Sequence, residues 1–348
     1  MSSAPVLLGI ISAALFGIST PLSKLLLGSL SQFQLAGLLY LGAGLGMVPF
    51  VIHRRRSSPR HRLDPRNTRR VVAAVLFGGC LGPVFLLLGL TAARASSVSL
   101  WLNLELAATA ILGRLFFRDH LGRAGAVGAA GALAAGVLVT VSEGPAGVVP
   151  ALWVCAACVC WGLDNNLTST VDALTPPEMT MVKGLVAGTV NLFIGTITSG
   201  SLPPAAVGLE SLLVGALCYG GSIVLFITAA QRMGAARGQV VFASAPFFGV
   251  LASFLLLAER PSWYQAAAVV VFLGAIALML RGRHSHRHLH EPLVHIHAHR
   301  HDDLHHDHAH PGLPPGTVHT HPHVHEPAEH EHPHLPDLHH RHPHAPGQ

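Results

Sequence analysis

The sequence predicts an all-α membrane protein in which ten transmembrane helices form two inverted five-helix repeats, followed by a disordered cytoplasmic tail. Three observations support this fold class. Half of the 348 residues are hydrophobic and only 11% are charged, a composition that soluble domains do not have. The apolar residues gather into ten runs long enough to cross a bilayer. After residue 281 these runs stop, and the remaining chain is polar and rich in histidine.

Each apolar run has the length of a membrane-spanning helix. The first has neither a basic leader nor a clear small-residue cleavage site, so we expect a retained helix rather than a removed signal peptide. Short loops join most of the runs, so neighbouring helices must be antiparallel. The predicted spans are residues 5–28, 33–53, 71–93, 96–117, 123–141, 149–168, 179–199, 205–230, 238–258 and 263–281.

Positive charge predicts the orientation of the spans. The loop at 53–70 contains eight Arg residues, and loops rich in Arg and Lys remain in the cytoplasm. With ten spans this places the N-terminus, the turns at 114–123 and 232–237, and the tail on the same side. Only Arg94 and Arg260 fall near outer turns. We therefore predict a multi-pass protein of the cell (plasma) membrane with both ends in the cytoplasm.

An odd number of spans in each half makes two related halves lie in opposite senses across the membrane, as in many secondary transporters. The predicted units are residues 1–142, the first repeat, residues 149–281, the second repeat, and residues 282–348, the tail. Short matches between the halves support the duplication: Phe16-Gly17 with Trp161-Gly162, and Asp119 with Glu259. We expect both acids to lie in solvated turns, where each helps to start the next helix.

Polar side chains inside the spans are candidates for function, because charged and amide groups in lipid face the bundle interior, where they find partners or water. The candidate residues for substrate binding or ion coupling are Glu105, Lys24, Asn103, Asp164, Asn165, Asn166, Lys183, Asn191 and Gln239.

Glu105 lies closest to the middle of a span, in the stretch LWLNLELAATAILGRLFFRD from Leu100 to Asp119. A carboxylate withdrawn from water is costly, and it can exchange a proton under physiological conditions. Glu105 is therefore a candidate for coupling to a proton or a cation. The alternative is a static partner of Lys24 or of another donor, which would only hold helices together.

Asp164 and Lys183 are predicted near the cytoplasmic ends of adjacent spans, so an ion pair between them is favourable. The pair is interpreted either as a gate or as interfacial charge that reaches water. Asn165 and Asn166 suit a polar substrate and equally suit hydrogen bonds between helices. Lys24 follows a stretch with Gly, Ser and Pro that could interrupt the first span.

The five Cys residues all lie inside apolar spans, so a disulfide framework is not expected. The sequence CAACVC at 155–160 places Cys155 and Cys158 on one helical face. Such a pair is compatible with transient copper(I) binding, although buried Cys commonly acts as a small hydrophobic packing residue.

The motifs LNLE at 102–105 and WGLDNNLT at 161–168, with KGLVAG at 183–188 and Asn191, accompany ten spans and a five-plus-five duplication. Together they resemble the EamA-like branch of the drug/metabolite transporter superfamily, and within it a subgroup in which some members have histidine-rich tails. The resemblance covers about residues 5–281. It implies solute movement by alternating access without nucleotide hydrolysis, and it does not imply one substrate. Many members have Pro near the middle of the fourth span, where this chain has Glu105.

The tail is a candidate metal-binding segment. Residues 284–344 hold 23 of the 26 His residues, mostly at alternate positions, and neutral imidazole binds Ni, Co, Zn and Cu. With almost no aliphatic residues for a core, the segment should be disordered when free. The metal candidates are His284, His286, His288, His290, His295, His297, His299, His301, His305, His306, His308, His310, His319, His321, His323 and His325; similar runs follow at His330, His332, His334, His339, His340, His342 and His344.

The role of such a tail stays open at this point. It can buffer metal, deliver it to the bundle or sense it. It can also act as a pH-dependent polycation, since imidazole protonates near pH ~6.5 and would then attract anionic lipid headgroups.

The sequence therefore predicts a secondary transporter of a small solute, with metal transport or metal regulation through the tail. A membrane-bound metal-storage or metal-sensing protein without transport is the alternative. No enzyme activity is expected, since the sequence contains no Walker-type loop, no nucleophile elbow and no His/Asp pair inside a span. No cofactor is required, and the tail is the candidate site for a divalent transition metal, Ni, Co, Zn or Cu.

The expected partners are the lipid bilayer, a small-molecule or ion substrate, and transition metal ions. No nucleic acid is expected, because the basic loop has no interleaved aromatic residues. The sequence leaves the oligomeric state open, and a homodimer is one of the states considered.

Overall fold

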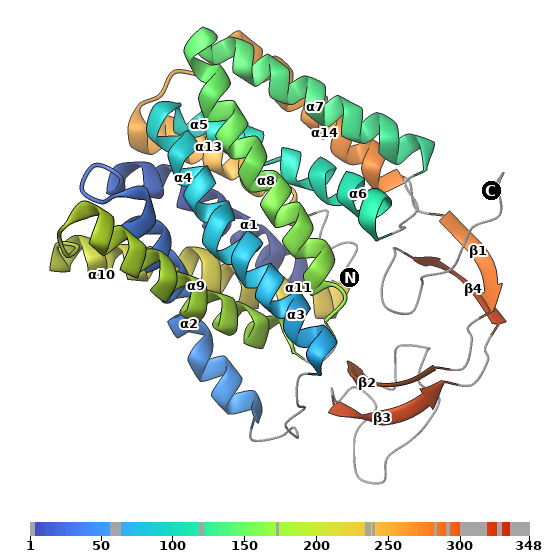
Figure 1. The fold of residues 1–348 in the computed structure, drawn as a ribbon. Coiled ribbons are helices and arrows are strands. Elements are labelled where there is room, and N and C mark those ends of the chain that lie inside the picture. Colours follow the sequence, from blue (N-terminus) through green and yellow to red (C-terminus); the bar gives the residue numbers. More distant parts are fainter. Residues whose placement is uncertain are drawn as a thin grey trace.

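The computed structural model describes a helical bundle and four short strands (Figure 1). The described residues are 4–55, 64–117, 122–171, 174–233, 238, 241–281, 284–289, 293–299, 319–325 and 329–334.

The first half of the bundle contains the predicted spans one to five. Span three is divided by a π-helical segment, η1, and span four consists of two helices. The elements are α1 (Ala4–Leu26), α2 (Gln32–Arg55), α3 (Pro65–Ala74), η1 (Val75–Leu81), α4 (Gly82–Ala92), α5 (Ala95–Trp101), α6 (Leu104–Phe116) and α7 (Arg123–Glu143).

The second half has a comparable order of elements. A second π-helical segment, η3, lies inside span eight. The elements are η2 (Pro145–Gly147), α8 (Val148–Thr168), α9 (Pro176–Ser199), α10 (Ala205–Val214), η3 (Gly215–Gly221), α11 (Ser222–Met233), α13 (Ala245–Leu257) and α14 (Trp263–Arg281).

Eight helical segments in the described residues are long and apolar enough to cross a membrane. Two shorter apolar helices, at 245–257 and 263–278, fall where the ninth and tenth spans are predicted. Large apolar side chains lie on the outside of the bundle, among them Leu152, Phe193 and Leu255 at 63%, 66% and 75% exposure. A bundle with such a surface is suited to lipid rather than to water.

The ends of several helices follow from local sequence. The Asp64 carboxylate accepts a hydrogen bond from the backbone N–H of Asn67 at 2.7 Å and caps α3, which begins at Pro65. At the start of α9, Thr175 and Glu178 form a reciprocal capping box. Gly200 ends α9 with a positive φ of 67°, a conformation that glycine adopts at little cost.

Span four differs from the continuous helix predicted over 96–117. A turn at Leu102 and Asn103 separates α5 from α6. The Asn103 side chain donates to the Leu100 carbonyl at 3.2 Å, and short-range side-chain bonds of this kind compete with helix continuation. A turn at Ala243 and Ser244 likewise precedes α13.

The helices of the two halves alternate in space. Helix α2 packs against α9, and α7 runs beside α14, as Figure 1 shows at the upper edge of the bundle. Helix α1 packs against α11 and α13, while α8 packs against α4 and α6. Glycines permit two close crossings: a side chain at Gly17 would meet the backbone of α13, and one at Gly162 would meet the backbone of α6.

The tail includes four strands, β1 (His284–Leu289), β2 (Leu293–His299), β3 (His319–His325) and β4 (Glu329–His334). β1 pairs antiparallel with β4, and β2 with β3, so that His residues stand opposite one another, as in His286 with His332. The sequence predicts no regular structure here, so the predicted disorder is not confirmed. Alternating residues favour a ladder, yet a two-stranded ladder by itself is marginally stable in water. The other tail positions lie outside the described residues.

Candidate functional site

An ion pair buried between α8 and α9 is the first element of the candidate site. The Lys183 ammonium lies 2.6 Å from the Asp164 carboxylate, and the two side chains are 19% and 6% exposed. Thr168 also donates to Asp164, at 3.0 Å. The sequence prediction that these two residues pair is confirmed. The pair neutralises two charges that would be costly to bury separately.

Glu105 lies beside this pair, on α6. Its carboxylate accepts a hydrogen bond from the Asn165 amide at 2.8 Å, and Asn165 also approaches the Thr109 hydroxyl at 3.3 Å. Asp164 and Lys183 are close enough to act on Glu105 electrostatically. Among the described residues, Glu105 has no ion-pair partner of its own. The Glu105 charge is therefore stabilised by the neutral Asn165 amide and not by a cationic side chain of that part of the chain.

Asn165 faces the protein rather than the lipid. It shares a face of α8 with Trp161 and Cys158, which precede it by four and seven residues, a spacing that repeats on one side of an α-helix. Leu152 and Val159, which are 63% and 45% exposed, lie on the opposite face. Asn165 is nevertheless exposed and Glu105 is partly exposed, so neither side chain is sealed inside the bundle.

The π-helical segment η1 supplies backbone carbonyls to the site. A π-helix departs from the usual i→i−4 ladder, and such segments are frequent at functional sites. The Tyr40 hydroxyl donates to the Gly78 carbonyl at 2.7 Å, and the Trp161 indole N–H donates to the same oxygen at 2.9 Å. These bonds connect α2 and α8 to η1. Glu105, Asp164, Asn165, Lys183, Tyr40 and Trp161 are called the polar centre below.

Two further predicted residues reinforce the surroundings of the polar centre. The Asn191 amide donates to the carbonyls of Gly79 and Cys80 at 3.3 and 3.2 Å, so it satisfies η1 from α9. The Asn166 amide donates to Thr109 on α6 at 3.0 Å and to its own helix. Both side chains are buried and saturate backbone groups, so they position the helices that carry Glu105 and Asp164.

Three other predicted residues are not brought into the polar centre. The Lys24 ammonium donates to carbonyls at the end of α4, including Leu90 at 2.5 Å and Ala93 at 3.0 Å. The interpretation of Lys24 as the partner of Glu105 is therefore wrong. Helix α1 continues without interruption through Pro21. Asn103 donates within its own turn, to the Leu100 carbonyl, and Gln239 lies outside the described residues.

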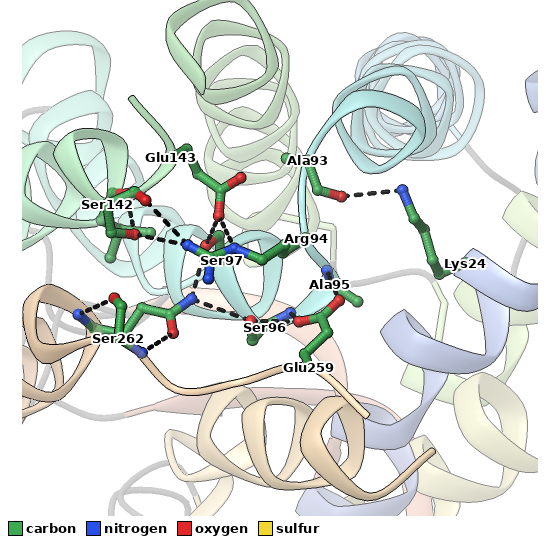
Figure 2. Close-up of polar contacts among 12 residues, drawn as sticks. Lys24, Ala93, Arg94, Ala95, Ser96, Ser97, Ser142, Glu143, Glu259 and Ser262 are labelled. Atoms are coloured by element: carbon green, nitrogen blue, oxygen red, sulfur yellow. Dashed lines mark hydrogen bonds and ion pairs between the residues drawn. The ribbon is translucent and has the colours of Figure 1, made fainter. Parts of the chain in front are cut away.

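A second polar cluster surrounds the turn between α4 and α5 (Figure 2). The Glu259 carboxylate, which follows α13, accepts hydrogen bonds from the backbone N–H groups of Ala95 and Ser96 at 2.7 and 2.9 Å. The Ser96 hydroxyl donates to the same carboxylate at 2.5 Å. Glu259 thus satisfies donors at the start of α5, which belongs to the other half of the chain.

Other charged and amide groups complete this cluster. Arg94 pairs with Glu143 at 2.6 Å, and Ser97 donates to the same carboxylate at 2.5 Å. The Gln265 amide donates to the hydroxyls of Ser96 and Ser97 at 3.1 and 2.9 Å. Lys24, Arg94, Ser96, Ser97, Glu143, Glu259 and Gln265 are called the α4–α5 network below. It ties α5 to α7 and to the segment that leads into α14.

The expectation for Glu259 is therefore wrong in one respect. The acid does not help to start the following helix, because Ser262 and Gln265 cap α14 through reciprocal bonds of 3.1 Å. Glu259 is instead held by free backbone N–H groups of a helix that is distant in sequence. Asp119, its predicted counterpart, lies outside the described residues.

No group of three or more His, Cys, Asp or Glu side chains suited to a metal is found within the described side chains. Cys158 is buried and lies 3.6 Å from the Trp101 carbonyl, as expected for a packing residue. Two Cys residues are fewer than such a group needs, so copper(I) binding at CAACVC stays a prediction. Among the predicted tail ligands, His290, His301, His305, His306, His308 and His310 lie outside the described residues.

Sequence reasoning missed Tyr40, Trp161 as a donor, and most of the α4–α5 network. A single Tyr inside an apolar span was an available signal, since its hydroxyl must find a partner when buried. Trp161 is marked in the sequence by a repeat match and by the WGLDNNLT motif, and neither indicates a hydrogen-bond donor. The sequence pattern gives no indication of the roles of Glu143 and Gln265, because both bond to Ser97, which is 46 and 168 residues away from them.

The apolar helices and the polar groups between them define a multi-pass membrane protein. A model of the EamA-like transporter family matches residues 3–141 and 149–281, and the chain belongs to this family. An uncharacterized transporter of Methanothermobacter thermautotrophicus is 25% identical over 297 residues, which cover 78% of this chain and 85% of that relative.

A solved crystal structure with 19% identity aligns with a TM-score of 0.57 over 80% of this chain and 96% of its own. This likeness shows the fold alone.

Proposed function

We propose that the protein is a secondary transporter that moves a small solute by alternating access, without nucleotide hydrolysis, through the space beside the polar centre. One observation carries the proposal: Glu105, the eleventh residue of the span Ala95–Phe116, is partly exposed and lacks an ion-pair partner within the described residues. A carboxylate at such a position is costly unless a permeating species or a coupling ion interacts with it.

The helix contacts support ten spans arranged as two inverted repeats. An inverted repeat relates each span of the first half to the span five places later. Under this relation, the observed contact between α1 and α13 corresponds to the observed contact between α8 and α6, and the contact between α2 and α9 corresponds to itself. The two π-helical segments begin at Val75 and Gly215, at equivalent places in the halves. A polar site at the interface of two such repeats is where alternating-access transporters bind their substrates.

The α4–α5 network supports a closed end of the bundle. Glu259 and Gln265 come from the second half, whereas Ser96 and Ser97 belong to the first, so their bonds must break if the halves separate there. The positive-inside rule assigns this end to the outside and both termini to the cytoplasm. The transporter would therefore open toward the cytoplasm in this conformation.

The histidine-rich tail supports an additional role in metal handling. In the two ladders, His residues stand opposite His residues, and opposite residues in an antiparallel ladder lie close together on one face. We propose that Ni, Co, Zn or Cu binds there and either regulates transport or is transported. A membrane-bound metal store or sensor without transport is the second candidate.

Proteoliposomes test the transport proposal. Uptake of radiolabelled amino acids, amines, nucleosides and organic acids would be measured for the full chain and for empty vesicles. We expect saturable, protein-dependent uptake and counterflow for at least one solute. E105Q, which removes the Glu105 charge, should reduce this uptake, whereas the matched control E210Q should not, because Glu210 is an exposed residue of α10. Absence of uptake for the whole panel by well-folded protein would contradict transport.

A deletion of residues 284–348 tests the metal proposal. We expect the full chain to retain more metal than the shortened chain after equilibrium dialysis with Ni²⁺ or Zn²⁺, because only the full chain carries the His runs. Equal metal retention by both forms would remove the metal role. Metal retention without solute uptake would favour the store or sensor.

A further inference from the structure

The charge of the polar centre is unbalanced. It contains two carboxylates, Glu105 and Asp164, and one ammonium group, Lys183, which lies 2.6 Å from Asp164. When all three are ionised, one negative charge remains, and it belongs to Glu105. Asn165 donates one hydrogen bond to this carboxylate but brings no positive charge. The chemical group that best complements such a site is a cation.

Two aromatic side chains of the polar centre, Tyr40 and Trp161, are held together on the backbone of η1. The Tyr40 hydroxyl and the Trp161 indole share the Gly78 carbonyl, and their own polar atoms lie 3.4 Å apart. These bonds fix the ring edges on the backbone of η1. Tyr40 is within electrostatic range of Glu105, and Trp161 is one helical turn from Asn165. Aromatic faces near a carboxylate are the usual recognition elements for ammonium groups.

An apolar surface continues from these rings into the second half of the chain. The Tyr40 and Tyr219 ring centroids are 6.2 Å apart, and Tyr219 contacts Phe16 at 5.6 Å. Phe16 in turn lies 5.4 Å from Phe242. All four side chains are only partly buried although they face other helices. The row could contact the apolar part of a ligand whose charged end is at Glu105.

We propose that the polar centre binds an amphipathic organic cation, with its ammonium group at Glu105 beside Tyr40 and Trp161 and its apolar body along Tyr219 and Phe16. This inference rests on the proposed transport function and specifies its substrate class. The Asp164 and Lys183 pair does not take part in binding charge, since the two neutralise each other. It holds α8 against α9 so that Asn165 and Glu105 remain aligned.

Isothermal titration of the full chain in detergent tests the proposal with a permanent cation and its neutral isostere. The probes are benzyltrimethylammonium and neopentylbenzene, which share one shape and differ in charge, and phenylacetate serves as an anion. We expect the wild type to prefer the cation. The loss of one charged interaction should weaken cation binding about tenfold to a hundredfold in E105Q, while E105D retains the preference and E210Q binds like the wild type.

The alternatives give different results. Equal binding of cation and isostere by the wild type, or unchanged cation binding in well-folded E105Q, would overturn the proposal. If proteoliposomes transport a neutral or anionic solute and no cation, the substrate class is wrong while the transport function stands. If the cation binds as expected but no solute crosses, the site is right and the transport function fails.

Discussion

Two helix crossings in this bundle have the same backbone arrangement and different chemistry. At one, Gly162 of α8 meets Ala108 and Thr109 of α6; at the other, Gly17 of α1 meets Ala245 and Gly249 of α13. The close approach is thus repeated in both halves.

The side chains around the two glycines differ. Trp161-Gly162-Leu163-Asp164-Asn165 in α8 corresponds to Phe16-Gly17-Ile18-Ser19-Thr20 in α1. The α6/α8 crossing is therefore charged, whereas the α1/α13 crossing is small, hydroxylated and aromatic. The comparison indicates that the duplicated backbone sets where helices meet, and that single substitutions within that frame set where charged side chains lie.

The largest expected effect of a substitution is on stability, at the ion pair between α8 and α9 that lies beside the α6/α8 crossing. K183M leaves Asp164 buried without its ammonium partner, which should cost about 3 kcal/mol. Chemical unfolding in detergent would measure this loss. The double variant K183M/D164N should recover most of it, because no unpaired charge remains. A double variant as unstable as K183M would show that packing, not charge, explains the effect.

Both crossings should be destabilised by a larger residue. G162A and G17A each add a methyl group that meets the backbone of the neighbouring helix, and overpacking of this kind costs about 1–3 kcal/mol. We expect both melting temperatures to fall, and G17A to fall further, because its methyl group would approach the Ala245 carbonyl more closely than the G162A methyl group approaches Thr109. A large effect at one glycine and none at the other would contradict the equivalence of the two crossings.

The α4–α5 network should respond more modestly. E259Q removes the negative charge from the start of α5 while it keeps one acceptor oxygen, so a loss of about 1 kcal/mol is expected. Weaker capping should also open this end of the bundle more often. A cysteine introduced at Ser97, with the native cysteines replaced, would report this as faster reaction with a water-soluble thiol reagent. Unchanged reactivity would argue against a role in closure.

The smallest effect is expected at the α1/α13 crossing. T20A alters the residue of α1 that corresponds to Asn165 of α8. The residue before it is Ser19, where α8 has Asp164, so this stretch of α1 carries no charge. Solute uptake should change by less than about twofold, a shift of under about 0.4 kcal/mol, because Thr20 is a buried residue of α1 and does not belong to the polar centre. A loss of uptake as large as that of N165A would show that both crossings bind the substrate.

The sequence was informative where one residue type has one physical consequence. Apolar runs predicted the helices, and the cost of burying charge in lipid singled out Glu105, Asp164 and Lys183 as functional candidates. The partners of these groups were less accessible. Lys24 caps α4 instead of reaching Glu105, because its ammonium group donates to backbone carbonyls at the end of α4. No sequence pattern identifies these carbonyls as its partners.

The breaks in helices were also difficult to predict. The π-helical segments η1 and η3 consist of ordinary apolar and glycine residues, so periodicity does not distinguish them from α-helix. The carbonyls of η1 nevertheless orient Tyr40, Trp161 and Asn191. The contribution of Glu259 to a helix of the other half likewise depends on tertiary packing alone.

Thiol accessibility of position 165 tests the central claim most directly. In a chain with the native cysteines replaced, N165C should react with a membrane-impermeant thiosulfonate reagent, and benzyltrimethylammonium should slow the reaction. L152C on the opposite, lipid-facing side of α8 is the matched control and should not react. If N165C is as inert as L152C from both sides of the membrane, the polar centre borders no aqueous path, and the account is contradicted.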